Sequence, residues 1–294
     1  MKRIKHALLN RSVPLEVGRI RHRLLARLGS YPILVYTMGK VGSSTVVESL
    51  RQSRVSSLVY HVHFLSPENL GRIQAKYEHA GNSIAARATL SKLLSGTLDH
   101  LSSSQILSPM NLRETYIISL VRDPVETFFS HVFQNPKTHR PFLLGDDGTI
   151  SKSAVERYVL EHFSSFGDNG DYISNWFDDE FLRYTGIDVY AHPFDCDIGF
   201  DTLTQGPWKV AIVSLENLGV SLPKAIYRLF GNRSNIEIAN SNIRADTGEA
   251  NLYREIKNGV SIPIECLQKV YATQYARHFF SPKHIRAALE KWSK

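Results

Sequence analysis

The sequence predicts an α/β fold with a central, mostly parallel sheet. Runs rich in β-branched and aromatic residues at 33–37, 58–65 and 116–121 indicate buried strands. A loop and a helix-forming segment follow each run, so that strands alternate with helices along the chain. Strands joined through helices pair in parallel by right-handed crossovers, and this alternation is typical of an α/β domain.

The composition is that of a folded protein. The 294 residues are 43% hydrophobic and 21% charged, which excludes collagen, coiled coils and low-complexity chains. Cys196 and Cys266 are the only cysteines, too few for a disulfide framework and without the spacing of a zinc site. This cysteine usage fits a reducing compartment, so we expect a cytoplasmic protein.

Further elements complete the predicted domain. They are helices that begin at Ser66-Pro67-Glu68 and at Asp123-Pro124, a helix over 83–100, a strand over 209–214, and a helix over 216–230 ended by Gly231. Residues 136–150 contain Pro136, Pro141, Gly145 and Gly148, and we expect a loop there that is also a candidate lid. The last third of the chain is helical and aromatic, which predicts a helical C-terminal extension.

Residues 1–30 form a basic arm ahead of an expected single domain over 31–294. The arm holds eight Lys and Arg against one Glu, so 8 − 1 = +7, which is the formal charge of the whole chain. The rest is formally neutral, which argues against a nucleic-acid-binding body and predicts no nucleic-acid partner. Leucine, isoleucine and valine alternate with the cations, although Pro14 and Gly18 argue against one continuous helix.

Two interpretations of this arm remain open, with an organellar transit peptide as a weaker third. The arm is either a helix lying on an anionic membrane surface or a solvated helix packed on the domain. No apolar run approaches the roughly 18 residues that span a bilayer. At most, therefore, we expect a peripheral protein at the inner membrane surface.

A glycine-punctuated loop, Thr37 to Thr45, joins the first strand to a helix over 45–50. Such a loop presents unpaired backbone N–H groups and the positive end of a helix to an anion. Lys40 precedes Gly42, whereas in the nucleotide-binding P-loop pattern lysine follows the second glycine. We therefore predict a P-loop-like phosphate cradle with the ammonium inside the loop, and a simple glycine turn is the alternative. Its candidate contacts are Gly39, Lys40, Val41, Gly42, Ser43, Ser44 and Thr45.

A second anion motif begins where the third strand ends. Arg122 leaves the strand, and Ser130 lies two turns into the next helix on the face of Asp123 and Thr127. This spacing brings a guanidinium and a hydroxyl to one phosphate. Because ligands on parallel sheets bind beyond the carboxyl ends of the strands, we expect both motifs and His61 to share one crevice.

Taken together, these motifs resemble the sulfotransferases that use 3′-phosphoadenosine 5′-phosphosulfate. Thr37 to Thr45 resembles their 5′-phosphosulfate loop, and Arg122 to Ser130 their 3′-phosphate motif. The segment 61–65, His-Val-His-Phe-Leu, is similar to the strand end where Golgi-type glycan sulfotransferases carry a catalytic His or Glu. Downstream segments resemble a bacterial group of capsular polysaccharide synthesis proteins: 175–180, 186–190, 194–195 and 278–281. The resemblance covers about residues 31–285 and implies a P-loop-like, three-layer α/β fold.

The resemblance also implies sulfuryl transfer from this co-substrate to a hydroxyl of a glycan or glycolipid. Lys40 stabilises the leaving phosphate in this scheme, so no metal is expected. A histidine with a pKa near neutrality is suited to accept the proton of the attacking hydroxyl. His61 is the first candidate for this base, and His63, on the same side of the strand, either orients it or binds acceptor.

Weaker candidates lie further along the chain. Trp176, within Asn175-Trp176-Phe177, is either a sugar-stacking platform or a core residue. Tyr253, Arg254 and Lys257 lie in a late basic segment that either closes over the nucleotide or forms a solvated helix face. Two other functions stay open: a nucleotide-dependent kinase that uses the same loop, and a non-catalytic nucleotide- or membrane-binding adaptor.

Overall fold

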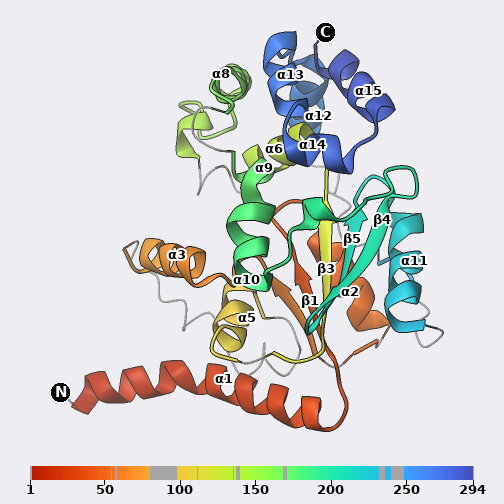
Figure 1. Ribbon diagram of the computed structural model, residues 1–294. Coiled ribbons are helices and arrows are strands. Elements are labelled where there is room, and N and C mark those ends of the chain that lie inside the picture. Colours follow the sequence, from red (N-terminus) through yellow and green to blue (C-terminus); the bar gives the residue numbers. More distant parts are fainter. Residues whose placement is uncertain are drawn as a thin grey trace.

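The computed structural model is a mixed α/β structure built around one five-stranded sheet (Figure 1). It describes residues 2–53, 55–56, 58–79, 98–110, 112–134, 136, 140–167, 171–231, 236–239 and 248–293. The strands are β1 (Pro32–Tyr36), β2 (Leu58–Val62), β3 (Thr115–Val121), β4 (Phe200–Gln205) and β5 (Trp208–Ser214). The α/β prediction is therefore confirmed.

The sheet has the order β2-β1-β3-β5-β4. The pairs β1–β2, β1–β3 and β3–β5 are parallel, and only β4 runs antiparallel, as a hairpin partner of β5. The register places Val35 opposite His61 and Ile118. Because β1, β2 and β3 run in the same direction, the loops that follow them emerge at one edge of the sheet.

Helices surround this sheet and extend beyond it. Those of the first two thirds are α1 (Lys2–Arg27), α2 (Ser43–Gln52), α3 (Pro67–His79), α5 (His100–Leu107), α6 (Pro124–Val132), α8 (Lys152–Ser164), α9 (Tyr172–Trp176) and α10 (Arg183–Thr185). The later ones are α11 (Leu218–Phe230), α12 (Gly248–Gly259), α13 (Ile264–Tyr271), α14 (Gln274–Phe279) and α15 (Pro282–Trp292). A π-helix, η3 (Phe177–Leu182), joins α9 to α10, and short 3-10 helices are η2 (Pro141–Leu143) and η4 (Val189–Ala191).

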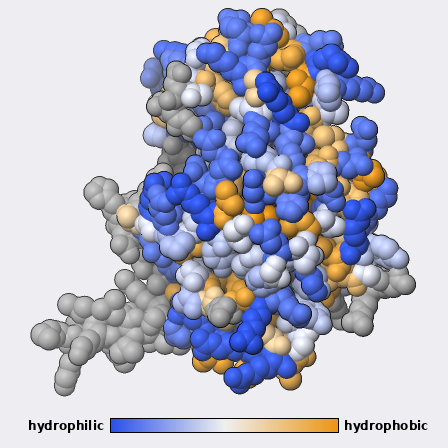
Figure 2. Space-filling view, in the orientation of Figure 1, coloured by the Kyte–Doolittle hydropathy of each residue, from blue (hydrophilic) through white to orange (hydrophobic). Residues whose placement is uncertain are grey.

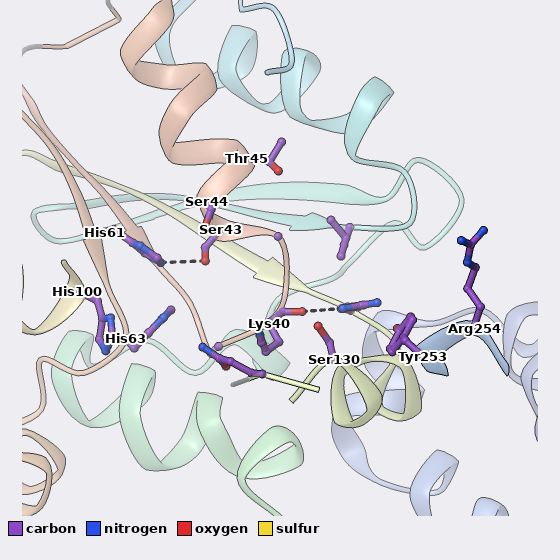
Figure 3. Close-up of a pocket in the computed structure, with 15 residues that line it drawn as sticks. Lys40, Ser43, Ser44, Thr45, His61, His63, His100, Ser130, Tyr253 and Arg254 are labelled. Carbon is purple, nitrogen blue, oxygen red and sulfur yellow. Dashed lines mark hydrogen bonds between the residues drawn. The ribbon is translucent and has the colours of Figure 1, made fainter. Parts of the chain in front are cut away.

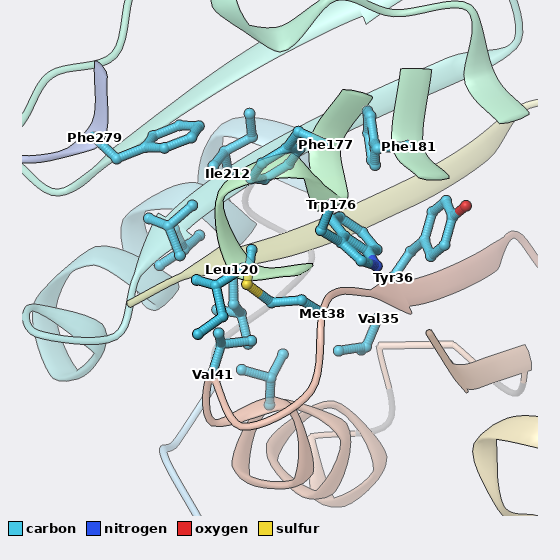
Figure 4. Close-up of a cluster of buried hydrophobic side chains, with 14 of the residues drawn as sticks. Val35, Tyr36, Met38, Val41, Leu120, Trp176, Phe177, Phe181, Ile212 and Phe279 are labelled. Carbon is cyan, nitrogen blue, oxygen red and sulfur yellow. The ribbon is translucent and has the colours of Figure 1, made fainter. Parts of the chain in front are cut away.

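The two faces of β1 are covered by different layers. Val35 points toward α2, whereas Tyr36 points to the other face, where its ring stacks on Phe181 and meets Trp176 edge-on (Figure 4). Tyr36, Trp176 and Phe181 are at most 1% exposed. The β-branched pattern that predicted a buried strand thus supplies side chains to two cores, one on each face of the sheet.

Glu180 is the polar centre of the second core. Its carboxylate accepts hydrogen bonds from the backbone N–H groups of Leu65 and Ser66, at 2.5 and 2.8 Å, and from the Tyr36 hydroxyl. Glu180 is 1% exposed, so these donors replace the water that a buried carboxylate loses. The bonds tie η3 to the segment that follows β2, and they hold the backbone just beyond His63 in place.

The structure corrects the prediction that the N-terminal arm is broken. Pro14 and Gly18 lie inside one helix, α1, which runs from Lys2 to Arg27 along the lower edge of Figure 1. Its C-terminal half packs on the domain: Leu15 is 7% exposed, Gly18 is buried, and the Arg19 guanidinium donates to the Gln105 carbonyl oxygen at 2.7 Å. This packing offsets the hydrogen bond that Pro14 removes.

Two further predicted elements are present in the structure. The strand over 209–214 and the helix over 216–230 correspond to β5 and α11. Strand β4 was not predicted, because it is a half-exposed edge strand without a continuous apolar run. Most of the predicted helix over 83–100 lies outside the described residues. No helix of the described part of the chain has the length and apolar character needed to cross a membrane.

Candidate active site

The loop between β1 and α2 is shaped to hold an anion. Helix α2 begins at Ser43 without a side-chain cap on its first turn, so the N-terminal N–H groups face outward from the helix end. Lys40 and Gly42 have positive φ values of 70° and 86°, which curl the loop into a concave turn. The φ of Gly42 favours glycine, and a Cβ there would also lie 2.4 Å from Leu215 Cδ1 and displace the end of that side chain.

This loop forms one wall of a cavity of about 690 Å³ (Figure 3). The walls come from the start of α2, the end of β2, the start of α5, the residue that follows β3, the C-terminal end of α6, the turn after β5, and α12. The lining residues are Gly39, Lys40, Gly42, Ser43, Ser44, Thr45, His61, His63, His100, Arg122, Ser130, Gln134, Leu215, Tyr253 and Arg254. Every catalytic or nucleotide contact predicted from the sequence is among them except Val41.

A hydrogen bond joins the two predicted anion motifs. The Arg122 Nη1 group donates to the carbonyl oxygen of Lys40 at 2.9 Å. Ser130, two turns into α6, lines the same cavity beside Lys40 (Figure 3). The guanidinium, the ammonium and the loop amides therefore surround one space, as expected from the meeting of strand ends at one edge of the sheet.

Glu126 lies behind Arg122 and holds several cations. Its carboxylate is 3.4 Å from Arg122 Nη2 and also pairs with Lys257 Nζ and Lys291 Nζ. Although burial opposes ionisation, the hydrogen bonds and charges of the two lysines lower the pKa of Glu126. These pairs connect α6 with α12 and α15, so the C-terminal extension is tied to the wall that carries Arg122.

Three histidines gather on the wall opposite Arg122. Ring centroids of His61 and His63 are 4.7 Å apart, and those of His63 and His100 are 4.6 Å apart. His61 Nε2 lies 2.9 Å from Ser43 Oγ, which links β2 to the first residue of α2. His63 Nδ1 lies 2.6 Å from the Thr37 carbonyl oxygen, which can only accept, so this ring nitrogen is the donor.

The tautomer of His63 follows from that bond. In a neutral imidazole with the proton on Nδ1, Nε2 carries a lone pair and can accept a proton. No described residue makes a hydrogen bond to His63 Nε2. Nε2 of His63 is therefore the ring nitrogen that carries the lone pair, whereas His61 Nε2 is hydrogen-bonded to Ser43 at the start of α2.

Burial and mutual repulsion keep these rings neutral. Desolvation, followed by the charges of His100 and Arg51, lowers the pKa of His61 to about 4. Desolvation and the neighbouring imidazoles of His61 and His100 lower the pKa of His63 well below its usual value. This corrects the expectation of a pKa near neutrality, because the ordinary histidine pKa of about 6.5 applies to a solvated ring and these two rings are buried beside one another.

Three sequence candidates do not line the cavity: Val41, Trp176 and Lys257, whose ammonium pairs with Glu126. Val41 is fully buried in the core beneath the loop, and it contributes shape to the loop rather than a side-chain contact (Figure 4). Trp176 is 1% exposed, and its Nε1–H donates to the His63 carbonyl oxygen at 3.3 Å. A sugar cannot stack on a ring that is enclosed in this way. Trp176 instead fixes the backbone that carries His63.

Other lining residues were missed or only touched on by the sequence analysis. His100 begins α5 after the capping residue Asp99, and no motif in the sequence connects it with His61 or His63. Leu215 and Gln134 follow β5 and α6 without a sequence signal. Tyr253 and Arg254 on α12 do line the cavity, which places the late basic segment beside the phosphate loop. Among the described residues, no group of three or more His, Cys, Asp or Glu is arranged to hold a metal ion.

Comparison with known proteins gives a family match over less than half of the chain. Residues 160–281 match the family described as putative capsular polysaccharide synthesis protein. The matched stretch runs from the end of α8 to just beyond α14 and includes β4 and β5, but it excludes the loop between β1 and α2, Arg122, and the cluster of His61, His63 and His100. Searches of curated proteins and of solved structures gave no match.

Proposed function

We propose that the protein is a sulfotransferase that moves the sulfuryl group of 3′-phosphoadenosine 5′-phosphosulfate to a hydroxyl of a glycan or glycolipid. One observation carries this proposal: Lys40, Arg122, Ser130 and the His61–His63 pair all line a single cavity. Such a cavity offers separate contacts for the two phosphate-bearing ends of the donor. It also offers a histidine that can take the proton of the acceptor hydroxyl. The match to a capsular polysaccharide synthesis family supports a carbohydrate acceptor.

Two anion contacts suit the two ends of this donor. The loop amides and Lys40 would bind the 5′-phosphosulfate, because backbone N–H groups at a helix start and an ammonium both favour negative charge. Arg122 and Ser130 would bind the 3′-phosphate, with the guanidinium already oriented by its bond to Lys40. The bond also couples the two contacts, so that filling one positions the other.

Every bond, electron pair and proton of the proposed transfer step can be assigned to these groups. The acceptor oxygen forms a bond to sulfur while the bond between sulfur and the bridging phosphate oxygen breaks. The electron pair of the broken bond goes to that oxygen, where Lys40 offsets the new charge. The acceptor proton goes to a histidine, and we assign it to His63 Nε2 because the Thr37 carbonyl fixes the tautomer. His61 then serves to position Ser43.

The test is donor-dependent transfer measured by mass. The full chain is incubated with the phosphosulfate donor and with bacterial polysaccharides and glycolipids, and products heavier by one sulfuryl group are sought. Transfer without added Mg²⁺ and in EDTA supports the proposal, because Lys40 supplies the positive charge. Phosphate transfer from ATP that EDTA abolishes and Mg²⁺ restores supports the kinase alternative. Donor binding without any turnover supports the adaptor.

A further inference from the structure

Helix α1 is fixed on the domain by one face. Leu15 and His22 are 7% and 5% exposed, and His22 Nδ1 lies 3.1 Å from the Tyr60 hydroxyl. Arg19 on the same side bonds to Gln105 in α5. These contacts set the rotation of α1 about its axis, so the face it turns outward is defined.

The outward face carries an apolar row. At about 100° per residue, Ile20 lies roughly opposite Leu15 and His22, and Leu24 follows one turn later. Ile20, Leu24 and Leu28 are 52%, 53% and 81% exposed. Figure 2 shows hydrophobic and hydrophilic residues next to each other along the lower edge of the molecule, where Figure 1 places α1. Large apolar side chains in a row on a helix are unusual on a surface that faces only water.

Cations converge beside this row. A cavity of about 490 Å³ lies between the end of α1, the start of β1 and the segment before β3, and it contains Arg23, Arg27 and Arg113. No described carboxylate lines it, and none pairs with these three arginines. Burial is the main cause that lowers the pKa of His22, and the charges of Arg21 and Arg23 lower it further.

We propose that α1 and Arg113 form a docking face for an anionic phospholipid membrane, with the arginine cavity receiving a headgroup phosphate. Guanidinium groups bind phosphate through paired N–H donors, and the apolar row enters the boundary between headgroups and acyl chains. A nucleic acid would satisfy the arginines and leave the apolar row in water, so the combination favours a membrane. Residues 1–30 carry a net charge of 8 − 1 = +7, in keeping with an anionic partner.

This face leaves the candidate active site open. Pro32, the first residue of β1, lines the arginine cavity, whereas Gly39 and Lys40 beyond the other end of β1 line the large cavity. A strand of five residues spans about 17 Å. The docking face therefore lies at the opposite end of β1 from the phosphate loop, and its test does not depend on the proposed sulfuryl transfer.

The experiment is co-sedimentation of the full chain with vesicles. Phosphatidylcholine vesicles are compared with vesicles that also contain phosphatidylglycerol, at low and high salt. We expect binding only to the anionic vesicles, weaker at high salt because screening shortens the range of the attraction. The variants Ile20→Ser/Leu24→Ser and Arg23→Gln/Arg27→Gln/Arg113→Gln should each lower the partition coefficient about tenfold or more.

Matched controls come from other exposed positions. Val220→Ser on α11, where Val220 is 60% exposed, and Arg157→Gln on α8 should bind like the unmodified chain. Circular dichroism checks that each variant keeps its helices. Equal binding to neutral and anionic vesicles overturns the proposal. Loss of binding with the arginine variant alone, with full binding by Ile20→Ser/Leu24→Ser, also overturns it, because the anionic surface would then be bound by charge without entry of the apolar row.

Discussion

The Tyr275 hydroxyl makes two hydrogen bonds to the backbone of Arg122: it donates to the Arg122 carbonyl oxygen at 2.8 Å and accepts from the Arg122 N–H at 3.0 Å. Tyr275 belongs to α14 in the C-terminal extension, 153 residues away in the sequence. A single buried hydroxyl therefore satisfies both backbone groups of the residue that leaves β3 toward the cavity. The extension thus positions Arg122 without touching a ligand.

Replacing Tyr275 by phenylalanine tests this positioning role. The change leaves the buried N–H and carbonyl groups of Arg122 without partners, and we expect the free energy of unfolding to fall by about 1–3 kcal/mol. Affinity for adenosine 3′,5′-bisphosphate should fall as well, because the guanidinium is no longer held in place. Denaturant unfolding and calorimetry measure the two effects. Tyr184→Phe, which removes a hydroxyl outside this cavity, is the control; an equal loss in both variants contradicts the positioning role.

Arg122 itself should decide the preference between nucleotides. We expect the unmodified chain to bind adenosine 3′,5′-bisphosphate more tightly than adenosine 5′-phosphate, because Arg122 and Ser130 contact the 3′-phosphate. Arg122→Ala should remove this preference, at a cost of about 1.5–3 kcal/mol, or roughly 10- to 100-fold in Kd. Arg157→Ala on α8 is a charge-matched control. Equal affinity of the unmodified chain for both nucleotides would show that this assignment is wrong.

The sequence predicted the parts of the site that depend on local pattern. A strand, a glycine loop and a helix start are encoded within about ten residues, so this strand–loop–helix unit was predicted from spacing alone, whereas its binding of phosphate stays a prediction. Arg122 was predicted because it comes directly after a strand, and Ser130 because it lies two turns into the helix that follows. We expected Arg122 and Ser130 to lie near the glycine loop because the carboxyl ends of parallel strands meet at one edge of a sheet. The alternation of strands and helices in the sequence predicted that the strands are parallel.

The sequence could not predict what depends on distant packing. His100 joins His61 and His63 because α5 packs on β2, and nothing near His100 in the sequence indicates that contact. The low pKa values of the histidines arise from this clustering and from burial. The continuity of α1 through Pro14 likewise reflects tertiary packing that overrides local propensity.

Lys40 combines the charge that we propose to stabilise the leaving phosphate with an unfavourable backbone conformation. Its φ of 70° lies in the left-handed region, which costs a residue with a Cβ about 1–2 kcal/mol. Lys40→Gly should therefore leave the free energy of unfolding unchanged or slightly higher, while transfer activity falls strongly because the ammonium is lost. Lys40→Ala removes the same charge and keeps the unfavourable φ, so it should be less stable than Lys40→Gly. Full activity of Lys40→Gly would contradict the role of the ammonium.

The lowered pKa values of the histidine pair predict how activity depends on pH. A neutral ring accepts the proton, and the pKa of His61 is lowered to about 4, that of His63 well below 6.5. The kcat/KM of the free enzyme should therefore stay constant from neutral pH down through the ordinary histidine pKa and fall only in more acidic solution. The kcat should fall at a higher pH than kcat/KM, because the bound phosphosulfate anion stabilises the charged rings and raises their pKa values.

The same lowered pKa values predict the direction of stability with pH. Below the ordinary pKa of about 6.5 the unfolded chain binds protons that the folded rings exclude, so the free energy of unfolding should decrease as the pH falls from there toward 4. Unfolding curves at each pH separate this loss from the kinetic effect, and rates are compared only where the chain stays folded. His63→Ala and His61→Ala should both flatten this dependence, since each removes one excluded proton.

The two variants should differ in their kinetics. His63→Ala should lower kcat roughly 10²- to 10⁴-fold with donor affinity nearly unchanged, which is the usual contribution of a positioned base. His61→Ala should mainly weaken donor binding, because Ser43 loses the ring that positions it in the phosphate loop. The reverse pattern, with the large kcat loss in His61→Ala, would assign the base to His61. Unchanged kcat in both would show that neither ring accepts the acceptor's proton.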